Sequence, residues 1–196
     1  MIKRLFDISA AFVGLALLAP LFAVVAVWIR IDSAGPVFFR QQRVGRWGKP
    51  FEIFKFRTMR TRTDETRQLT VGDDSRITRA GRFLRQYKLD ELPQLINVLQ
   101  GTMSLVGPRP EVPRYVACYP ADARTIVLSV RPGITDWASI LYRDESRMLG
   151  QAADPEKAYI DTVLPIKLSY YVRYVQERSF WIDLQIICKT VVAIMH

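Results

Sequence analysis

The chain has 196 residues, 49% of them hydrophobic, and a formal net charge of +9. This length allows one domain with a buried core, and the apolar content excludes a disordered chain. The basic excess favours anionic partners: nucleic acid, acidic lipid headgroups or phosphorylated substrates. With His196 as the only histidine and Cys118 and Cys188 as the only cysteines, we expect no histidine-based triad, zinc site or disulfide framework, but two buried thiols in a reducing compartment.

The first element is an apolar run, Ile8 to Ile29, which holds no charged residue and is long enough to cross a bilayer. It is longer than the apolar region of a cleaved signal peptide and lacks a small-residue cleavage site. Basic residues flank both ends, and the positive-inside rule places both flanks in the cytoplasm. These flanking residues are Lys3 and Arg4 on one side and Arg30, Arg40, Arg43 and Arg46 on the other.

Pro20 lies near the middle of this run and removes a helical hydrogen bond there. About 12 helical residues on each side of Pro20 reach roughly 18 Å, which is enough to cross one leaflet. A re-entrant helix–break–helix would leave both basic flanks in the cytoplasm. A kinked transmembrane helix is the alternative, since proline is tolerated there, and the residues alone leave both interpretations open.

The next elements are two strands, Pro36 to Phe39 and Phe51 to Met59, around a turn at residues 45–48. The two-residue period of a strand places Lys55 and Arg57 on one face, so two cations would point the same way. A solvated strand face is the alternative interpretation. The polar segment from Thr61 to Ser75 is expected to be a loop.

Two helical patterns follow, and an acidic pair lies between them. Their apolar spacing is that of a helix, at Ile77, Ala80, Leu84 and Tyr87 and then at Leu92, Leu95, Ile96 and Leu99. Because Pro93 suits a first helical turn, we expect Asp90 and Glu91 at a helix start, where the positive end of the dipole keeps both ionised. Alone, such a pair more often marks a favourable charge–dipole contact than a catalytic site.

The remaining segments read as two rigid turns and a helical C-terminal third. Ser104 to Pro110 is a turn carrying Arg109, and Arg131 to Thr135 is another. The helical third has apolar stripes and aromatic residues that suit either a membrane interface or packing on the domain core.

Seven stretches, taken in order, resemble the bacterial sugar transferase family, the monotopic phosphoglycosyl transferases. Each stretch is weak alone, but their order over about 130 residues is specific. Two positions depart from the family pattern: Ala19 precedes Pro20 where a serine is frequent, and Asp136 precedes Trp137 where many members have glycine. The matching stretches are Lys3 to Asp7, Gly35 to Gln41, Phe54 to Met59, Arg76 to Arg85, Leu89 to Leu95, Met103 to Pro110, and Arg131 to Thr135.

The resemblance implies an α+β, mainly helical fold with a small β-hairpin. It favours the re-entrant interpretation for residues 1–34, with interfacial amphipathic helices around a cytoplasmic, membrane-associated catalytic domain at residues 35–196. The implied location is the cytoplasmic face of a bacterial inner membrane. Membrane lipid is an implied partner, and a homodimer is an option.

The reaction implied by the resemblance transfers a sugar-1-phosphate from a UDP-sugar to a polyprenyl (undecaprenyl) phosphate and releases UMP. By motif position, Asp90 is the nucleophile that carries a covalent phospho-sugar, and Asp90 and Glu91 are the ligands of a Mg²⁺ ion, with Mn²⁺ as a possible substitute. Basic side chains would bind the phosphates and nucleotide, arginine in a bidentate way. They are Lys55, Arg57, Arg85, Arg109 and Arg131.

Two other classes of function fit part of the sequence. A non-enzymatic basic protein of the membrane surface explains the charge and the apolar run, but it does not require Asp90 and Glu91 beside arginines. A nucleic-acid binder explains the charge alone, and the sequence has no zinc or RNA-binding aromatic pattern, so nucleic acid is not an expected partner. The sugar is not indicated by any residue pattern.

Overall fold

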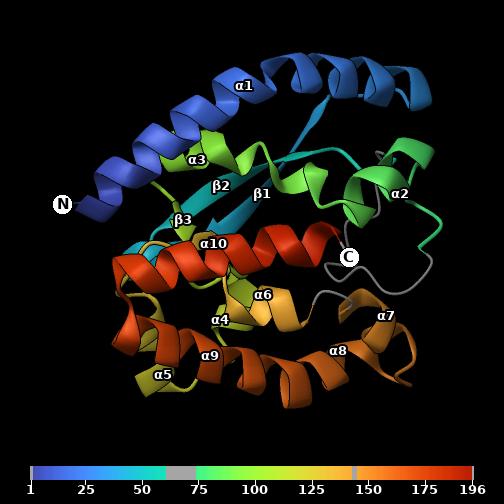
Figure 1. The fold of residues 1–196 in the computed structure, drawn as a ribbon. Coiled ribbons are helices and arrows are strands. Elements are labelled where there is room, and N and C mark those ends of the chain that lie inside the picture. The colour runs from blue at the N-terminus through green and yellow to red at the C-terminus, as the bar shows by residue number, and fades with distance from the viewer. Residues whose placement is uncertain (1, 61–73, 143–144, 196) are drawn as a thin grey trace.

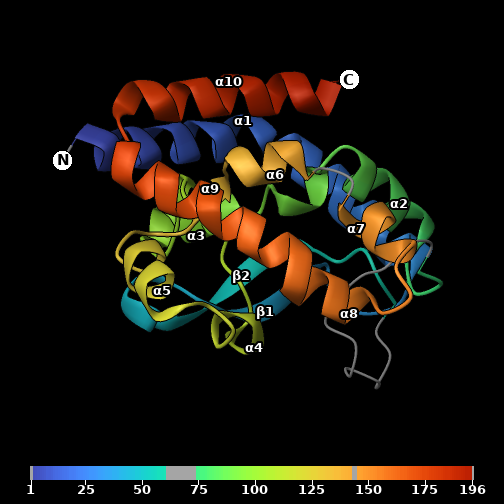
Figure 2. The same ribbon diagram turned by 90° about the horizontal axis from the view of Figure 1, so that it is seen from below.

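The computed structural model describes residues 2–60, 74–142 and 145–195, so the loop expected from Thr61 to Ser75 lies almost wholly outside the described residues. Within these ranges the fold is mainly helical, as expected, and it contains two small two-stranded sheets. Figure 1 shows the N-terminal helix α1 (Ile2–Asp32) along one side of the molecule and helix α9 (Leu164–Glu177) along the opposite side. Figure 2 shows α1 and α10 toward one face of the molecule and the β1–β2 hairpin toward the opposite face.

Helix α1, Ile2–Asp32, runs through Pro20 without interruption. The expected helix–break–helix is therefore one continuous helix in the structure, and Figure 1 shows that this helix bends along its length. The helix is apolar and long enough to cross a membrane. Ala11, Val25 and Ile29 are buried against the rest of the protein. The opposite side exposes large apolar residues, among them Leu5, Phe12, Leu17, Val24, Val27 and Ile31.

Both ends of α1 are attached to the rest of the fold. Near the N-terminal end, Asp7 is 3% exposed and its carboxylate accepts hydrogen bonds from Ser104 Oγ (2.8 Å) and Leu105 N (3.3 Å). At the C-terminal end, the Asp32 carboxylate accepts a hydrogen bond from Ala80 N (2.9 Å). Arg57 donates to the carbonyl oxygens of residues 33 and 34, just beyond the helix.

The expected hairpin is confirmed, with shifted bounds. Strands β1 (Phe38–Val44) and β2 (Pro50–Phe56) pair antiparallel around a 3₁₀ turn, η1 (Arg46–Gly48). The Asn97 side chain joins this hairpin to helix α3, because Asn97 Oδ1 accepts from Phe54 N (2.9 Å) and Asn97 Nδ2 donates to Glu52 O (2.7 Å). Asn97 is fully buried, so these bonds fix β2 against the helix.

The two helical patterns correspond to α2 (Arg79–Gln86) and α3 (Gln94–Gln100). Thr78 caps α2, since its side chain accepts a hydrogen bond from Gly81 N. Between the helices lies a separate 3₁₀ turn, η2 (Leu89–Glu91), entered through Lys88 at φ 55°. A positive φ is uncommon for a residue other than glycine and is often found at functional sites.

The two expected turns contain short strands that pair with each other, which the sequence analysis did not predict. Strand β3 (Ser104–Val106) runs parallel to β4 (Gly133–Thr135). The backbones approach so closely at Gly107 and Gly133 that a Cβ on Gly133 would lie 2.0 Å from Gly107 N. Both positions therefore require glycine.

The C-terminal part is helical, as expected. Its helices pack around a core of residues such as Tyr115, Val127, Leu168 and Tyr171. The expectation of two buried thiols is wrong, because Cys118 and Cys188 are exposed and free. The elements are α4 (Pro113–Val116), α5 (Ala121–Val127), α6 (Trp137–Leu141), α7 (Glu145–Gly150), α8 (Pro155–Ala158), the π-helix η3 (Tyr159–Val163), α9 (Leu164–Glu177) and α10 (Phe180–Met195).

Candidate functional site

Three segments distant in the sequence meet at the Glu91 carboxylate. Lys55, on β2, donates from Nζ to Glu91 Oε1 at 2.7 Å. Arg109, on the turn after β3, donates from Nη1 to Glu91 Oε2 at 2.9 Å and from Nη2 to Oε1. The three side chains are 13–28% exposed, so the contact is partly shielded from water. This bidentate arginine pairing and the lysine give Glu91 two positive partners.

Local structure holds these three side chains in place. The Asn97 bonds fix β2, and with it Lys55, against α3. Glu91 lies on η2, which leads directly into the same helix. The backbone before Arg109 is held by a hydrogen bond from Gly133 N to Pro108 O at 3.0 Å. The cluster therefore lies at the junction of the hairpin, α3 and the β3–β4 pair.

The two adjacent carboxylates have pKa values displaced in opposite directions. Burial opposes ionisation of Glu91, but Arg109 and Lys55 hold its pKa well below the usual range. Burial and the neighbouring Glu91 charge raise the pKa of Asp90, against the nearby cations Lys55, Arg85 and Lys88. Asp90 is only 7% exposed and lies on η2 rather than in the first turn of α3, so burial opposes the stabilisation that we expected from the helix start.

The expected phosphate contacts separate into two groups. Lys55, Arg109 and Arg85 lie at the acidic pair: the first two bind Glu91, and Arg85 is near enough to lower the pKa of Asp90. Arg57 lies just beyond β2 and binds the end of α1, so it does not share a target with Lys55. Arg131 Nε donates to Gly101 O at 2.8 Å, at the opposite end of α3.

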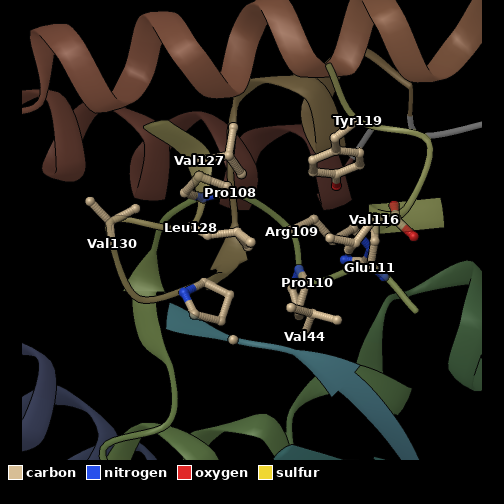
Figure 3. A pocket seen from close by; sticks show the side chains of 12 residues that line it. Val44, Pro108, Arg109, Pro110, Glu111, Val116, Tyr119, Val127, Leu128 and Val130 are labelled. Atoms are coloured by element: carbon tan, nitrogen blue, oxygen red, sulfur yellow. The ribbon is translucent and has the colours of Figure 1, made fainter. Parts of the chain in front are cut away.

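The sequence analysis missed a second set of buried charges close to Arg109. Glu111 and Lys167 are 6% and 3% exposed and lie near Arg43 and Tyr159. The one signal nearby in the sequence was Glu111 itself, two residues after the predicted Arg109. Lys167 comes from a helix distant in the sequence. Figure 3 shows Arg109, Pro110 and Glu111 in succession beside Val44 at a small pocket whose lining does not include Asp90.

Asp90 and Glu91 are the residues here that could hold a divalent cation. Within residues 2–60, 74–142 and 145–195, no group of three or more His, Cys, Asp or Glu side chains could do so. A hard cation such as Mg²⁺ needs one or two carboxylates when substrate phosphates complete its coordination. The donor chemistry of the pair fits, although both Glu91 oxygens already accept hydrogen bonds from Lys55 and Arg109.

Known proteins resemble the chain over its whole length. A family model described as bacterial sugar transferase matches residues 1–196. The UDP-N-acetylgalactosamine-undecaprenyl-phosphate N-acetylgalactosaminephosphotransferase of Aeromonas hydrophila is 39% identical over 99% of this chain, which spans 44% of that protein. The UDP-glucose:undecaprenyl-phosphate glucose-1-phosphate transferase of Caulobacter vibrioides is 39% identical over 98% of this chain and 69% of its own length. The uncharacterized sugar transferase EpsL of Bacillus subtilis is 40% identical over 97% of this chain and 85% of its own length.

The opposite pKa displacements at the acidic pair lead to a prediction. Glu91→Gln removes a negative charge beside Asp90 and leaves Lys55 and Arg109 without their anion. Both effects favour the ionised form of Asp90, so its pKa should fall. Carboxyl ¹³C NMR titration of aspartate-labelled protein in detergent measures this pKa. Glu177→Gln, which breaks the exposed pair with Arg173, is the matched control and should leave it unchanged. An unchanged or higher Asp90 pKa in Glu91→Gln would contradict this account.

Proposed function

Because the chain belongs to the bacterial sugar transferase family, we propose that it transfers a sugar-1-phosphate from a UDP-sugar to undecaprenyl phosphate and releases UMP. The names of the Aeromonas and Caulobacter relatives support this class of donor and acceptor. Such a reaction would take place at the cytoplasmic face of a bacterial inner membrane. The net charge of +9 suits two anionic substrates and an anionic lipid surface.

The observation that carries the mechanism is the unequal environment of the two carboxylates. Glu91 is bound on both oxygens by Lys55 and Arg109, which reduces its electron-donating capacity. Asp90 has a raised pKa and is therefore the more basic carboxylate of the pair. Paired groups whose pKa values are pushed apart usually have different roles. This supports Asp90 as the nucleophile and Glu91 as the group that holds the cations in place.

The proposed reaction has two displacements at one phosphorus atom. A carboxylate oxygen of Asp90 attacks the phosphorus that bears the sugar, and the bond to the bridging oxygen breaks. UMP leaves with that electron pair, and the sugar phosphate stays bound to Asp90. A phosphate oxygen of the lipid then attacks the same phosphorus, and the bond to Asp90 breaks. Division of one difficult transfer into two easier ones is the advantage of a covalent carboxylate intermediate.

The basic residues at the site suit the charge that this reaction concentrates. The UDP diphosphate and the lipid phosphate bring several negative charges to Asp90, and preorganised cations stabilise such transition states. Arg109, Lys55 and Arg85 lie at the acidic pair and are the proposed phosphate contacts. Arg57 and Arg131 bind carbonyl oxygens elsewhere, which favours a structural role for both.

A divalent cation is part of the proposal, with Asp90 and Glu91 as its protein ligands. Mg²⁺ would neutralise diphosphate charge and polarise the phosphorus toward attack. Because Lys55 and Arg109 already bind both Glu91 oxygens, Glu91 would share its lone pairs or exchange a partner. Mn²⁺, which accepts the same oxygen ligands, is the expected substitute.

The attachment of α1 supports a topology in which both of its ends face the cytoplasm. Asp7 and Asp32, near opposite ends of the helix, bind the same domain through Ser104 and Ala80. A domain on one side of the bilayer could not hold both ends of a straight span. The exposed apolar side of α1 would face lipid, and a bend of the helix, which Pro20 would favour, would limit the depth of insertion. A re-entrant segment at residues 1–34 meets these conditions.

The sharpest prediction concerns Asp90. Without lipid acceptor, purified protein mixed with a UDP-sugar should release at most one UMP per active site. The peptide containing Asp90 should gain the mass of one phospho-sugar. Asp90→Asn keeps the shape of the side chain but is a poor nucleophile, so both signals should vanish and turnover should fall on the order of a million-fold. Arg109→Ala, which removes one stabilising contact, should cost about a hundred- to a thousand-fold.

Two outcomes of this experiment would overturn the assignment of Asp90. Phospho-sugar trapped on Glu91 would exchange the roles of the two carboxylates. UMP release only when both substrates are present, with no adduct, would indicate direct attack by the lipid phosphate. Release of UDP would indicate transfer of the sugar without its phosphate. Full cellular activity of Asp90→Asn would favour a non-enzymatic membrane-surface function.

A second prediction concerns the cation. We expect excess EDTA to abolish UMP release, and Mg²⁺ or Mn²⁺ to restore it, because the two carboxylates and the diphosphate are all anionic and would repel each other without a divalent cation between them. Isothermal titration of UDP with and without Mg²⁺ provides a measurement independent of turnover, and affinity should rise with the cation. Full turnover in excess chelator would rule out the role given to Asp90 and Glu91 as cation ligands.

A third prediction tests the topology. Because Cys118 and Cys188 are exposed, both are first replaced by serine, and one cysteine is then introduced as Ile2→Cys or Ser33→Cys. A membrane-impermeant maleimide should label neither position in intact spheroplasts and both in inverted vesicles. A protein retaining only Cys118 provides the control for the cytoplasmic side. Labelling of the two positions from opposite sides of the membrane would contradict the re-entrant arrangement.

A further inference from the structure

A buried cluster of charged and polar side chains lies around Glu111, two positions after Arg109. We call it the Glu111 network, and its members are Arg43, Glu111, Glu145, Tyr159 and Lys167. The Glu111 carboxylate accepts a hydrogen bond from Tyr159 Oη at 2.6 Å and lies 3.5 Å from Lys167 Nζ. Arg43 Nη1 lies 3.5 Å from the other carboxylate oxygen. Lys167 also donates to Glu145 at 3.0 Å. The five residues of the network come from β1, the turn after β3, α7, η3 and α9.

The network holds the backbone that carries Arg109. Arg43 Nη1, besides its pairing with Glu111, donates to Pro110 O at 3.0 Å. Val44 N donates to Glu111 O at 3.0 Å. The backbone that follows Arg109 is thus attached to β1 by two hydrogen bonds. The Glu111 side chain attaches the same segment to the C-terminal helices, so the turn is held from two sides.

The charges of the network are balanced and mutually dependent. Burial opposes ionisation of Glu111, but Lys167 and Arg43 hold its pKa below the usual range. Burial likewise opposes protonation of Lys167, but Glu111 and Glu145 raise its pKa. A neutral side chain at position 111 would leave Arg43 without its ion-pair partner and Lys167 with Glu145 as its remaining anion. Uncompensated buried charges are strongly unfavourable, so the turn would have to rearrange.

We propose that Glu111 is a positioning residue that fixes the turn from which Arg109 reaches the acidic pair. Its effect passes through Arg109, since the contacts of the Glu111 side chain are with Arg43, Tyr159 and Lys167 rather than with the acidic pair. A displacement of a catalytic contact by about 1 Å can cost about a hundred-fold in rate. This inference rests on the proposed function of Asp90 and Arg109.

A double-mutant cycle tests this inference. Glu111→Gln keeps the shape of the side chain and removes the charge, and kcat/KM for UMP release should fall about tenfold or more. In an Arg109→Ala background, the same substitution should cost less than about twofold, because the contact that it disturbs is already gone. Glu177→Gln, an identical substitution in an exposed ion pair, is the matched control and should leave kcat/KM unchanged in both backgrounds.

The outcomes separate positioning from a merely structural role. Additive losses, or a lower melting temperature with unchanged kcat/KM, would overturn the positioning role. If Glu111→Gln does not fold in detergent, Tyr159→Phe, which removes one hydrogen bond to Glu111, replaces it in the cycle. Its expected loss is about three- to tenfold, again only with Arg109 present. Absence of UMP release by the unmodified protein would instead reject the proposed function.

Discussion

The contact of Glu91 with Lys55 and Arg109 is the interaction on which the candidate site depends. It joins the hairpin, the 3₁₀ turn before α3 and the turn after β3, three segments that no local pairing would bring together. Glu91 also determines the character of its neighbour, because its negative charge contributes to the raised pKa of Asp90. Glu91 thus binds Lys55 and Arg109, and the adjacent Asp90 has a raised pKa.

Two features of the surrounding structure make this contact possible. Asn97 hydrogen-bonds to the backbone of β2 and so fixes the strand that carries Lys55. The glycine pair at positions 107 and 133 lets the β3 and β4 backbones approach within a distance that any side chain would prevent. The Asn97 contact depends on a fully buried side-chain amide, and the approach of the two strands depends on glycines without a Cβ. Both features fix the positions of polar side chains in the site, and neither contributes an atom to it.

The sequence predicted the elements of this fold better than their contacts. Apolar periodicity and turn residues located the hairpin, α2, α3 and the apolar α1, because these signals are local. The same signals could not predict that Ser104–Val106 and Gly133–Thr135 pair, since that contact joins segments far apart in the chain. They also misjudged Lys55 and Arg57: a shared strand face did not give a shared target, because the end of α1 offers carbonyl oxygens to Arg57. The Glu111 network was missed because Lys167 reaches it from a distant helix.

The way α1 lies along the rest of the protein has a consequence for any shortened form of the chain. Ala11 completes a core cluster with Ile53 and Leu95, and Val25 and Ile29 complete another with Phe56 and Leu84. The rest of the fold therefore cannot complete its interior without the residues that α1 contributes. A version without α1 would expose the apolar residues of both clusters to solvent, and we expect it to aggregate.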